Sequence, residues 1–102
     1  MPMFRFLEPG PLADEELVLQ LVERSPGDST HDIAPSYRFK MTRRDRNVEM
    51  GRIDLRIGQT HNLVMYGGHI GYRVHAEYRG HHFAARSVRL LIPLARAHNL
   101  GT

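Results

Sequence analysis

The chain has 102 residues, which is enough for one small domain covering residues 1–102. It has no cysteine, which excludes disulfides, a thiolate nucleophile and cysteine-ligated metals. A net charge of +3 is too small to indicate nucleic-acid binding, and no apolar run approaches the roughly 20 residues of a membrane span or a signal-peptide core. We therefore expect a soluble, cytoplasmic protein that is not embedded in a membrane.

The N-terminal half of the chain predicts an extended arm, two strands and a hairpin turn. Residues 4–12 contain two prolines and one glycine, which favours an arm or loop. Residues 16–23 alternate apolar and other side chains in the manner of a strand, although Leu17, Leu21 and Arg24 would also fit one face of a helix. Residues 25–30 have the composition of a loop. Residues 37–42 alternate again and predict a second strand, and residues 44–47 predict the turn that follows it.

The remainder predicts two further strands and a long helix. Residues 48–57 form the third strand, with Ile53, Leu55 and Ile57 on one face and Arg52, Asp54 and Arg56 on the other. Residues 58–62 are a loop, and residues 65–75 form the fourth strand. From Phe83 the apolar period becomes helical, with Ala84, Ser87, Val88, Leu91, Leu94 and Ala95 on one side. The opposite side, with Arg86, Arg89, Pro93 and Arg96, is expected to be solvated. The pattern predicts an α+β fold, in which a mostly antiparallel sheet of about four strands carries one long C-terminal helix.

A basic turn joins the fourth strand to this helix. Residues 77–82 read Glu-Tyr-Arg-Gly-His-His, and residues 72–102 hold five arginines and one glutamate. The N-terminus of a helix offers unpaired backbone N–H groups and the positive end of its dipole, both of which favour an anion. Arg79 adds a guanidinium that can bind phosphate through two hydrogen bonds. The local chemistry therefore predicts a phosphate site.

Residues 74–84 resemble motif A of the GNAT acetyltransferases, a strand that ends in valine followed by (Gln/Arg)-x-x-Gly-x-(Gly/Ala) at the start of a helix. The chain matches at Val74, Tyr78, Arg79, Gly80 and Ala84, and residues 89–96 look like the third helix of that superfamily. The resemblance implies that the anion is the pyrophosphate of acetyl-CoA and that the pantetheine arm lies along the strand ending at Val74. The implied cofactor-binding residues are Tyr72, Val74, Arg79, Gly80, His81, His82, Phe83 and Ala84.

Two positions depart from this motif. His82 stands where the motif has glycine, and Ala76 stands where proline is common. Glycine lets the backbone approach the phosphate without a side chain in the way. The imidazole of His82 either blocks the site or donates a further hydrogen bond to phosphate.

The resemblance implies transfer of an acetyl group from acetyl-CoA to a primary amine. The acceptor stays open between a peptide, an aminoglycoside, a polyamine and a small metabolite, because residues 25–36 have room only for a single turn or loop where the family has two helices. Family members continue past the third helix with a fifth strand and a fourth helix. The resemblance therefore covers the N-terminal half of such an enzyme and leaves the fourth strand with an open edge at Ile70, Tyr72 and Val74. Such an edge predicts a homodimer, a partner chain that supplies the missing half, or a longer protein.

No catalytic residue is assigned from the sequence. Asp54, Glu49 and His69 are candidates for a general base, but Asp54 is expected to pair with arginines across the strands. Tyr72 is expected in the core and Tyr78 beneath the turn. His75, His81 and His82 have no zinc-site spacing, so no metal is expected.

Two alternatives to an active enzyme remain. One is a non-catalytic CoA-binding or dimerising remnant of the fold, which the substitution at His82 favours. The other is a small basic nucleic-acid binder, which is disfavoured because exposed aromatic platforms interleaved with basic residues are missing.

Overall fold

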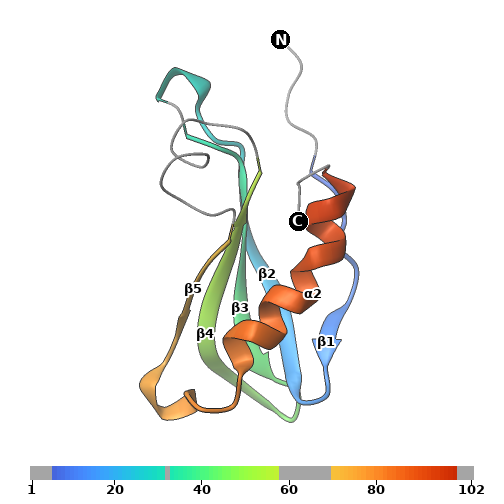
Figure 1. Ribbon diagram of the computed structural model, residues 1–102, viewed down its shortest axis with the longest axis vertical. Helices are drawn as coiled ribbons and strands as arrows, with labels where there is room; N and C mark the ends of the chain where they lie inside the picture. The colour runs from blue at the N-terminus through green and yellow to red at the C-terminus, as the bar shows by residue number, and fades with distance from the viewer. Residues whose placement is uncertain (1–5, 32, 58–69, 99–102) are drawn as a thin grey trace.

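One antiparallel sheet of five strands, in the same order as the chain, forms the framework of the described residues. The computed structural model describes residues 6–31, 33–57 and 70–98. The strands are β1 (Leu12–Asp14), β2 (Leu17–Ser25), β3 (Ser36–Arg43), β4 (Arg46–Arg56) and β5 (Ile70–Val74). A single long helix, α2 (Phe83–Ala97), crosses one face of the sheet (Figure 1). The α+β class, the antiparallel sheet and the C-terminal helix are thus confirmed.

The predicted number of about four strands was too low, because β1 was missed. This strand begins at Leu12, the last residue of the predicted arm, and continues to Asp14. It pairs with β2 across a tight turn in which Glu15 has a left-handed backbone, with φ of 53°. A strand of three residues is too short to show a period in the sequence. It forms because β2 offers it an edge.

The predicted hairpin between residues 37 and 57 is confirmed. β3 and β4 are joined by the turn at Arg44 and Asp45, and each strand extends one or two residues beyond the predicted N-terminal bound. Between β2 and β3, the described residues include one short 3-10 turn, η1 (Ser29–His31), as expected. Of the predicted fourth strand, residues 70–74 are seen as β5, and residues 65–69 lie outside the described part.

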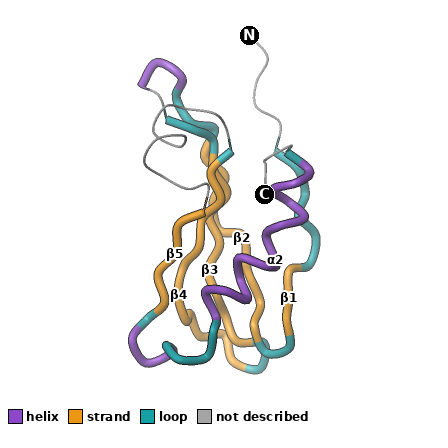
Figure 2. The backbone as a smooth tube through the Cα atoms, in the orientation of Figure 1, coloured by secondary structure: helices purple, strands orange, loops and turns teal. Residues whose placement is uncertain are grey.

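The hydrophobic core lies between the sheet and α2. Alternate residues of β2, β3 and β4 point to this face, and the helix contributes Phe83, Leu91 and Leu94. Figure 2 shows the helix running diagonally over the sheet from the end of β5 towards β1. The buried apolar residues are Leu17, Leu19, Tyr37, Phe39, Met41, Met50, Ile53, Leu55, Ile57, Phe83, Leu91 and Leu94. Burying one such side chain contributes about 1.5–3 kcal/mol, so this layer dominates the stability of the fold.

A buried tyrosine ties both ends of the described chain to the sheet. The hydroxyl of Tyr37 accepts a hydrogen bond from the Leu7 backbone N–H at 2.7 Å and lies 2.7 Å from His98 Nε2. Burial raises the pKa of the Tyr37 hydroxyl and lowers the pKa of His98, so the neutral form of each group is favoured. This contact fixes the C-terminal end of α2 over the core.

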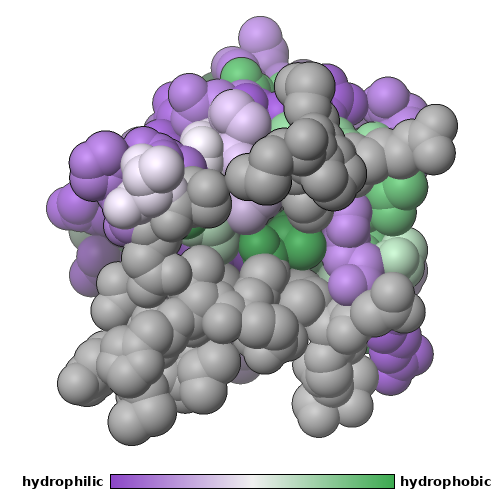
Figure 3. Space-filling model, turned by 90° about the horizontal axis from the view of Figure 1, so that it is seen from above, coloured by the Kyte–Doolittle hydropathy of each residue, from purple (hydrophilic) through white to green (hydrophobic). Residues whose placement is uncertain are grey.

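The described residues that are visible at the end of the molecule opposite the β1–β2 turn are mostly polar (Figure 3). Figure 3 views this end, and hydrophilic residues cover most of its described part, with apolar residues in separate small areas. Within the described part of the chain, no helix combines the length and the apolar character needed to cross a membrane.

Candidate functional site

A hollow of about 440 Å³ lies where β5 meets the start of α2. Its lining includes every residue of the predicted cofactor set except His81, together with Arg73 and Tyr78. The lining residues are Tyr72, Arg73, Val74, Tyr78, Arg79, Gly80, His82, Phe83 and Ala84. No carboxylate is among them, whereas Arg79 and His82 are; Arg73 pairs with Arg52, which places its side chain on the opposite face of the sheet. The predicted strand, turn and helix therefore meet around one concave surface with a positive character.

β5 forms one wall of the hollow and one edge of the sheet described here. Its register pairs Val74 with Gly51 and Tyr72 with Ile53, and the His75 N–H donates to the Met50 carbonyl at 2.9 Å. Hydrogen bonding alternates along an antiparallel pair, so the backbone groups of Tyr72 and Val74 point away from β4. An extended ligand or another strand can pair with them.

The position of Tyr72 differs from the prediction. The residue was expected in the core, but 60% of its surface is exposed. Its side chain lies on the same face of the sheet as Ile53, as the alternation predicts. It lies at the sheet edge, however, where no further strand among the described residues covers it. Tyr78 is half-buried and packs against the core, as predicted.

The turn between β5 and α2 holds Arg79 across the hollow. A short 3-10 turn, η2 (Ala76–Tyr78), follows β5, and Gly80 has φ of 94°, which only glycine adopts without strain. The Arg79 Nε donates to the Val74 carbonyl at 3.1 Å. Arg79 is therefore hydrogen-bonded to a backbone carbonyl on the outer edge of β5. An extended ligand would pair with the backbone on this same edge.

The N-terminus of α2 opens into the same hollow without a side-chain cap. His82 is the N-cap residue, its side chain makes no capping hydrogen bond, and no acidic residue lies in the first turn. The first N–H groups and the positive end of the helix dipole are thus not neutralised from within the helix. His81 instead lies beside Phe83, with ring centroids 5.4 Å apart, and does not line the hollow.

His82 has a left-handed backbone, with φ of 61°. This conformation costs a residue with a Cβ roughly 1–2 kcal/mol but costs glycine almost nothing. The motif that this segment resembles has glycine at the position of His82, where the backbone of this chain has a positive φ. The substitution therefore brings both backbone strain and an imidazole into the lining.

Replacing His82 by glycine should raise the free energy of unfolding by about 0.5 to 1 kcal/mol, because relief of the strained φ exceeds the entropy cost of glycine. Urea denaturation would measure the change. His81→Gly is the matched control, since His81 has no positive φ and should lose stability. Equal losses in both variants would show that the strain at His82 is absent.

The two candidate bases among the described residues, Glu49 and Asp54, do not line the hollow. Glu49 is held by Arg52 at 3.0 Å and by His75 Nε2 at 3.1 Å. Asp54 pairs with Arg56 at 3.1 Å, along its own strand rather than across strands as predicted. His69 lies outside the described residues. Among the described residues, no group of three or more histidine or acidic side chains is arranged to hold a metal ion.

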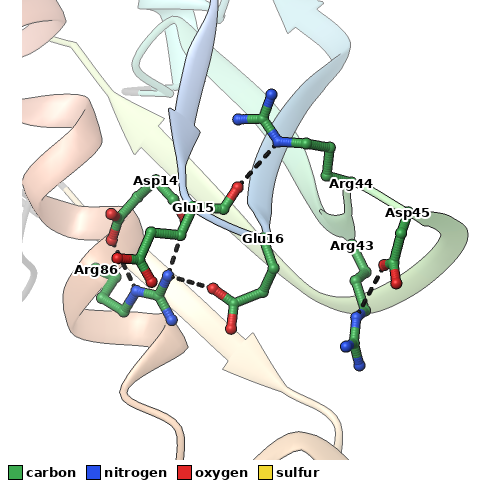
Figure 4. Close-up of polar contacts among 7 residues, drawn as sticks. All are labelled: Asp14, Glu15, Glu16, Arg43, Arg44, Asp45 and Arg86. Atoms are coloured by element: carbon green, nitrogen blue, oxygen red, sulfur yellow. Dashed lines mark hydrogen bonds and ion pairs between the residues drawn. The ribbon is translucent and has the colours of Figure 1, made fainter.

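Arg86 is structural, and its predicted place on a solvated helix face was wrong. Its side chain is only 17% exposed and donates to the Asp14 carboxylate at 2.7 Å and to Glu16 at 2.6 Å. Figure 4 shows these bonds joining α2 to the turn between β1 and β2. The hydrogen bonds to both carboxylates raise the pKa of Arg86. The predicted exposure of Arg89 and Arg96 is confirmed.

Comparison of the chain with protein-family models, with curated proteins and with solved structures returned no match.

Proposed function

We propose that this chain binds acetyl-CoA in the hollow between β5 and α2 and belongs to a GNAT-type N-acetyltransferase. The observation that carries the proposal is the lining itself, which unites seven of the eight residues that the motif implied, around an uncapped helix N-terminus. The pyrophosphate would lie against the N–H groups of that helix and Arg79. The pantetheine arm would pair with the outward backbone groups of Tyr72 and Val74.

The residues present fit the ligand chemically, with one rearrangement. The lining of the hollow includes Arg79 and no carboxylate, which suits a pyrophosphate. Pairing of pantetheine with the Val74 carbonyl, however, requires Arg79 to leave it. Arg79 then becomes available to the pyrophosphate. A single movement of the Arg79 side chain would thus free the Val74 carbonyl for pantetheine and provide a cation for the pyrophosphate.

The reaction we propose is transfer of the acetyl group to a primary amine. The amine nitrogen attacks the thioester carbon, the new N–C bond forms and the C–S bond breaks. One amine proton passes to the departing thiolate, directly or through solvent, so that the products are the acetamide and CoA thiol. We propose a cytoplasmic location, which agrees with a sequence without cysteine.

Calorimetric titration of acetyl-CoA into the purified chain tests the site. We expect micromolar binding, which Arg79→Ala should weaken by about tenfold because a charged contact to phosphate is lost. Arg89→Ala removes an equal charge from the exposed side of α2 and should leave the affinity unchanged. No binding at millimolar ligand, or equal weakening in both variants, would refute the proposal.

A second candidate function is a non-catalytic CoA-binding or dimerising remnant of the same fold. It is favoured by His82, which lines the hollow at the position where the motif has glycine, and by the place of β5 at the edge of the described strands. An acetyl-transfer assay separates the two candidates when CoA binds. Measuring the molecular mass of the same sample shows whether a second copy pairs with β5, as we propose for the homodimer.

A further inference from the structure

The sheet face opposite α2 is charged and has no element packed on it in the described part of the chain. In β4, Arg52, Asp54 and Arg56 lie on this face, while the intervening residues are buried against the helix. Arg52 and Arg38 have side chains that are 59% and 60% exposed, so both are accessible from solvent.

Cations lie side by side on this face. The strand register places Lys40 of β3 opposite Arg52 of β4, and Arg52 opposite Arg73 of β5. Like charges directly opposite in a sheet destabilise each other. Neither Lys40 nor Arg73 has an ion pair with another described residue. The face therefore has an excess of positive charge: its cations are Arg38, Lys40, Arg52, Arg56 and Arg73, and the carboxylates bound to them are Glu23, Glu49 and Asp54.

A shallow hollow lies within this array. It measures about 210 Å³, and its charged lining residues are Arg38, Arg52 and Asp54. Beside it, the guanidinium of Arg56 lies against Gly71 of β5, where a Cβ would collide with Arg56 Nη2 and come within 3.2 Å of Asp54 Oδ1. Gly71 thus makes room for the Asp54–Arg56 pair of β4. Gly71 itself belongs to β5, the strand that also borders the proposed acetyl-CoA site.

The proposed function gives this arrangement a use. If acetyl-CoA lies along β5 on the side of α2, the helix blocks one approach to the strand. An amine must then approach from the open face, where it meets Asp54 among several arginines. A polycation would be repelled there, whereas an amine that also carries an anionic group would be attracted at both ends.

We propose that the face opposite α2 binds the acceptor, and that the acceptor is a small primary amine bearing a phosphate or carboxylate. Arg38 and Arg52 hold the anionic group, and Asp54 receives the ammonium group before it is deprotonated for attack. This inference rests on the proposed function and narrows its acceptors: polyamines and aminoglycosides are excluded.

Chemical-shift titration of the ¹⁵N-labelled chain, saturated with CoA, tests this surface. The probes are O-phosphoethanolamine, β-alanine, ethanolamine and spermidine. We expect the two anionic amines to shift amides of β3, β4 and Gly71 with about tenfold or greater affinity over the other two, since charge-assisted hydrogen bonds are lost without the anion. The tighter of the two identifies phosphate or carboxylate as the preferred group. Ethanolamine or spermidine binding there as tightly would overturn the proposal.

Paired variants with equal charge provide the control. Arg38→Gln with Arg52→Gln should abolish these shifts, whereas Arg89→Gln with Arg96→Gln, both on the exposed side of α2, should leave them. Equal binding by both double variants would overturn the proposal. Shifts of residues 79–84 on addition of CoA report the cofactor site separately. Their absence, with the anionic amine still bound, would refute acetyl transfer and leave an anion site on this face.

Discussion

Replacing Arg86 by alanine is expected to lower the free energy of unfolding by about 2 kcal/mol. The change leaves Asp14 and Glu16 without the guanidinium that binds both, and removes a cation placed 5.3 Å from the centre of the Phe83 ring. Breaking a fully buried ion pair costs about 3–5 kcal/mol. We expect less, because the two carboxylates are 37% and 41% exposed and regain water.

Denaturation at several pH values adds a second test of Arg86. Its hydrogen bond is the main cause that lowers the pKa of Glu16 below its ordinary value of 4.5. The stabilisation from Glu16 is therefore complete above about pH 4.5 and is lost as the pH falls through the lower folded-state value. The difference in free energy of unfolding between the wild type and Arg86→Ala should therefore become smaller as the pH is lowered. Arg89→Ala, on the same helix and exposed, should have little effect at any pH; a loss as large as that of Arg86→Ala would refute the role of Arg86.

Replacing Gly51 by alanine is expected to cost about 3 kcal/mol and to displace β5. A Cβ at this position would overlap the Arg73 carbonyl oxygen and come within 2.9 Å of the Val74 Cα. Overpacking costs about 1–3 kcal/mol, and we expect the upper end because the obstacle is backbone, which cannot rotate away. Since β5 forms a wall of the hollow, the proposed affinity for acetyl-CoA should fall together with the free energy of unfolding.

Gly10→Ala separates this collision from the general effect of replacing glycine. A Cβ at Gly10 would meet no atom within 4 Å, so only its left-handed φ of 68° is strained. We expect it to lose about 1 kcal/mol and to keep the hollow intact. Urea denaturation gives both stabilities, and amide shifts of β5 report its position. A Gly51→Ala variant with native β5 shifts would contradict the close approach of the two strands.

Side-chain alternation made most of the sheet predictable. β3 and β4 each have one face against α2 and one charged face, so apolar and polar residues alternate in the sequence as they do in space. The same alternation placed Tyr72 on the correct face. The alternation could not show that β5 is an edge strand of the described sheet, which is why Tyr72 was wrongly predicted to be buried.

The errors at β1 and Arg86 have different causes. Arg86 binds Asp14, 72 residues away in the sequence, whereas β1 lies next to β2 in the chain but is too short for its three residues to show a period. Helical periodicity could not reveal that a carboxylate from another element lies beside Arg86 and draws its side chain out of solvent. The motif located the hollow because its strand, turn and helix are consecutive. The backbone φ of His82, in contrast, became visible only in the structure.

The sequential strand order has a consequence for how the molecule assembles. Each described strand pairs with the strand next to it in the chain, and the β1–β2 and β3–β4 hairpins, which have tight turns, can form as local units with little loop entropy to overcome. The contacts of α2 with β1 and β2 are the ones that close the chain over long distances. Both walls of the hollow, β5 and α2, are the last elements in the described part of the chain. The hollow is therefore completed only when these last two elements have been made, in the same step that closes the core between the sheet and α2.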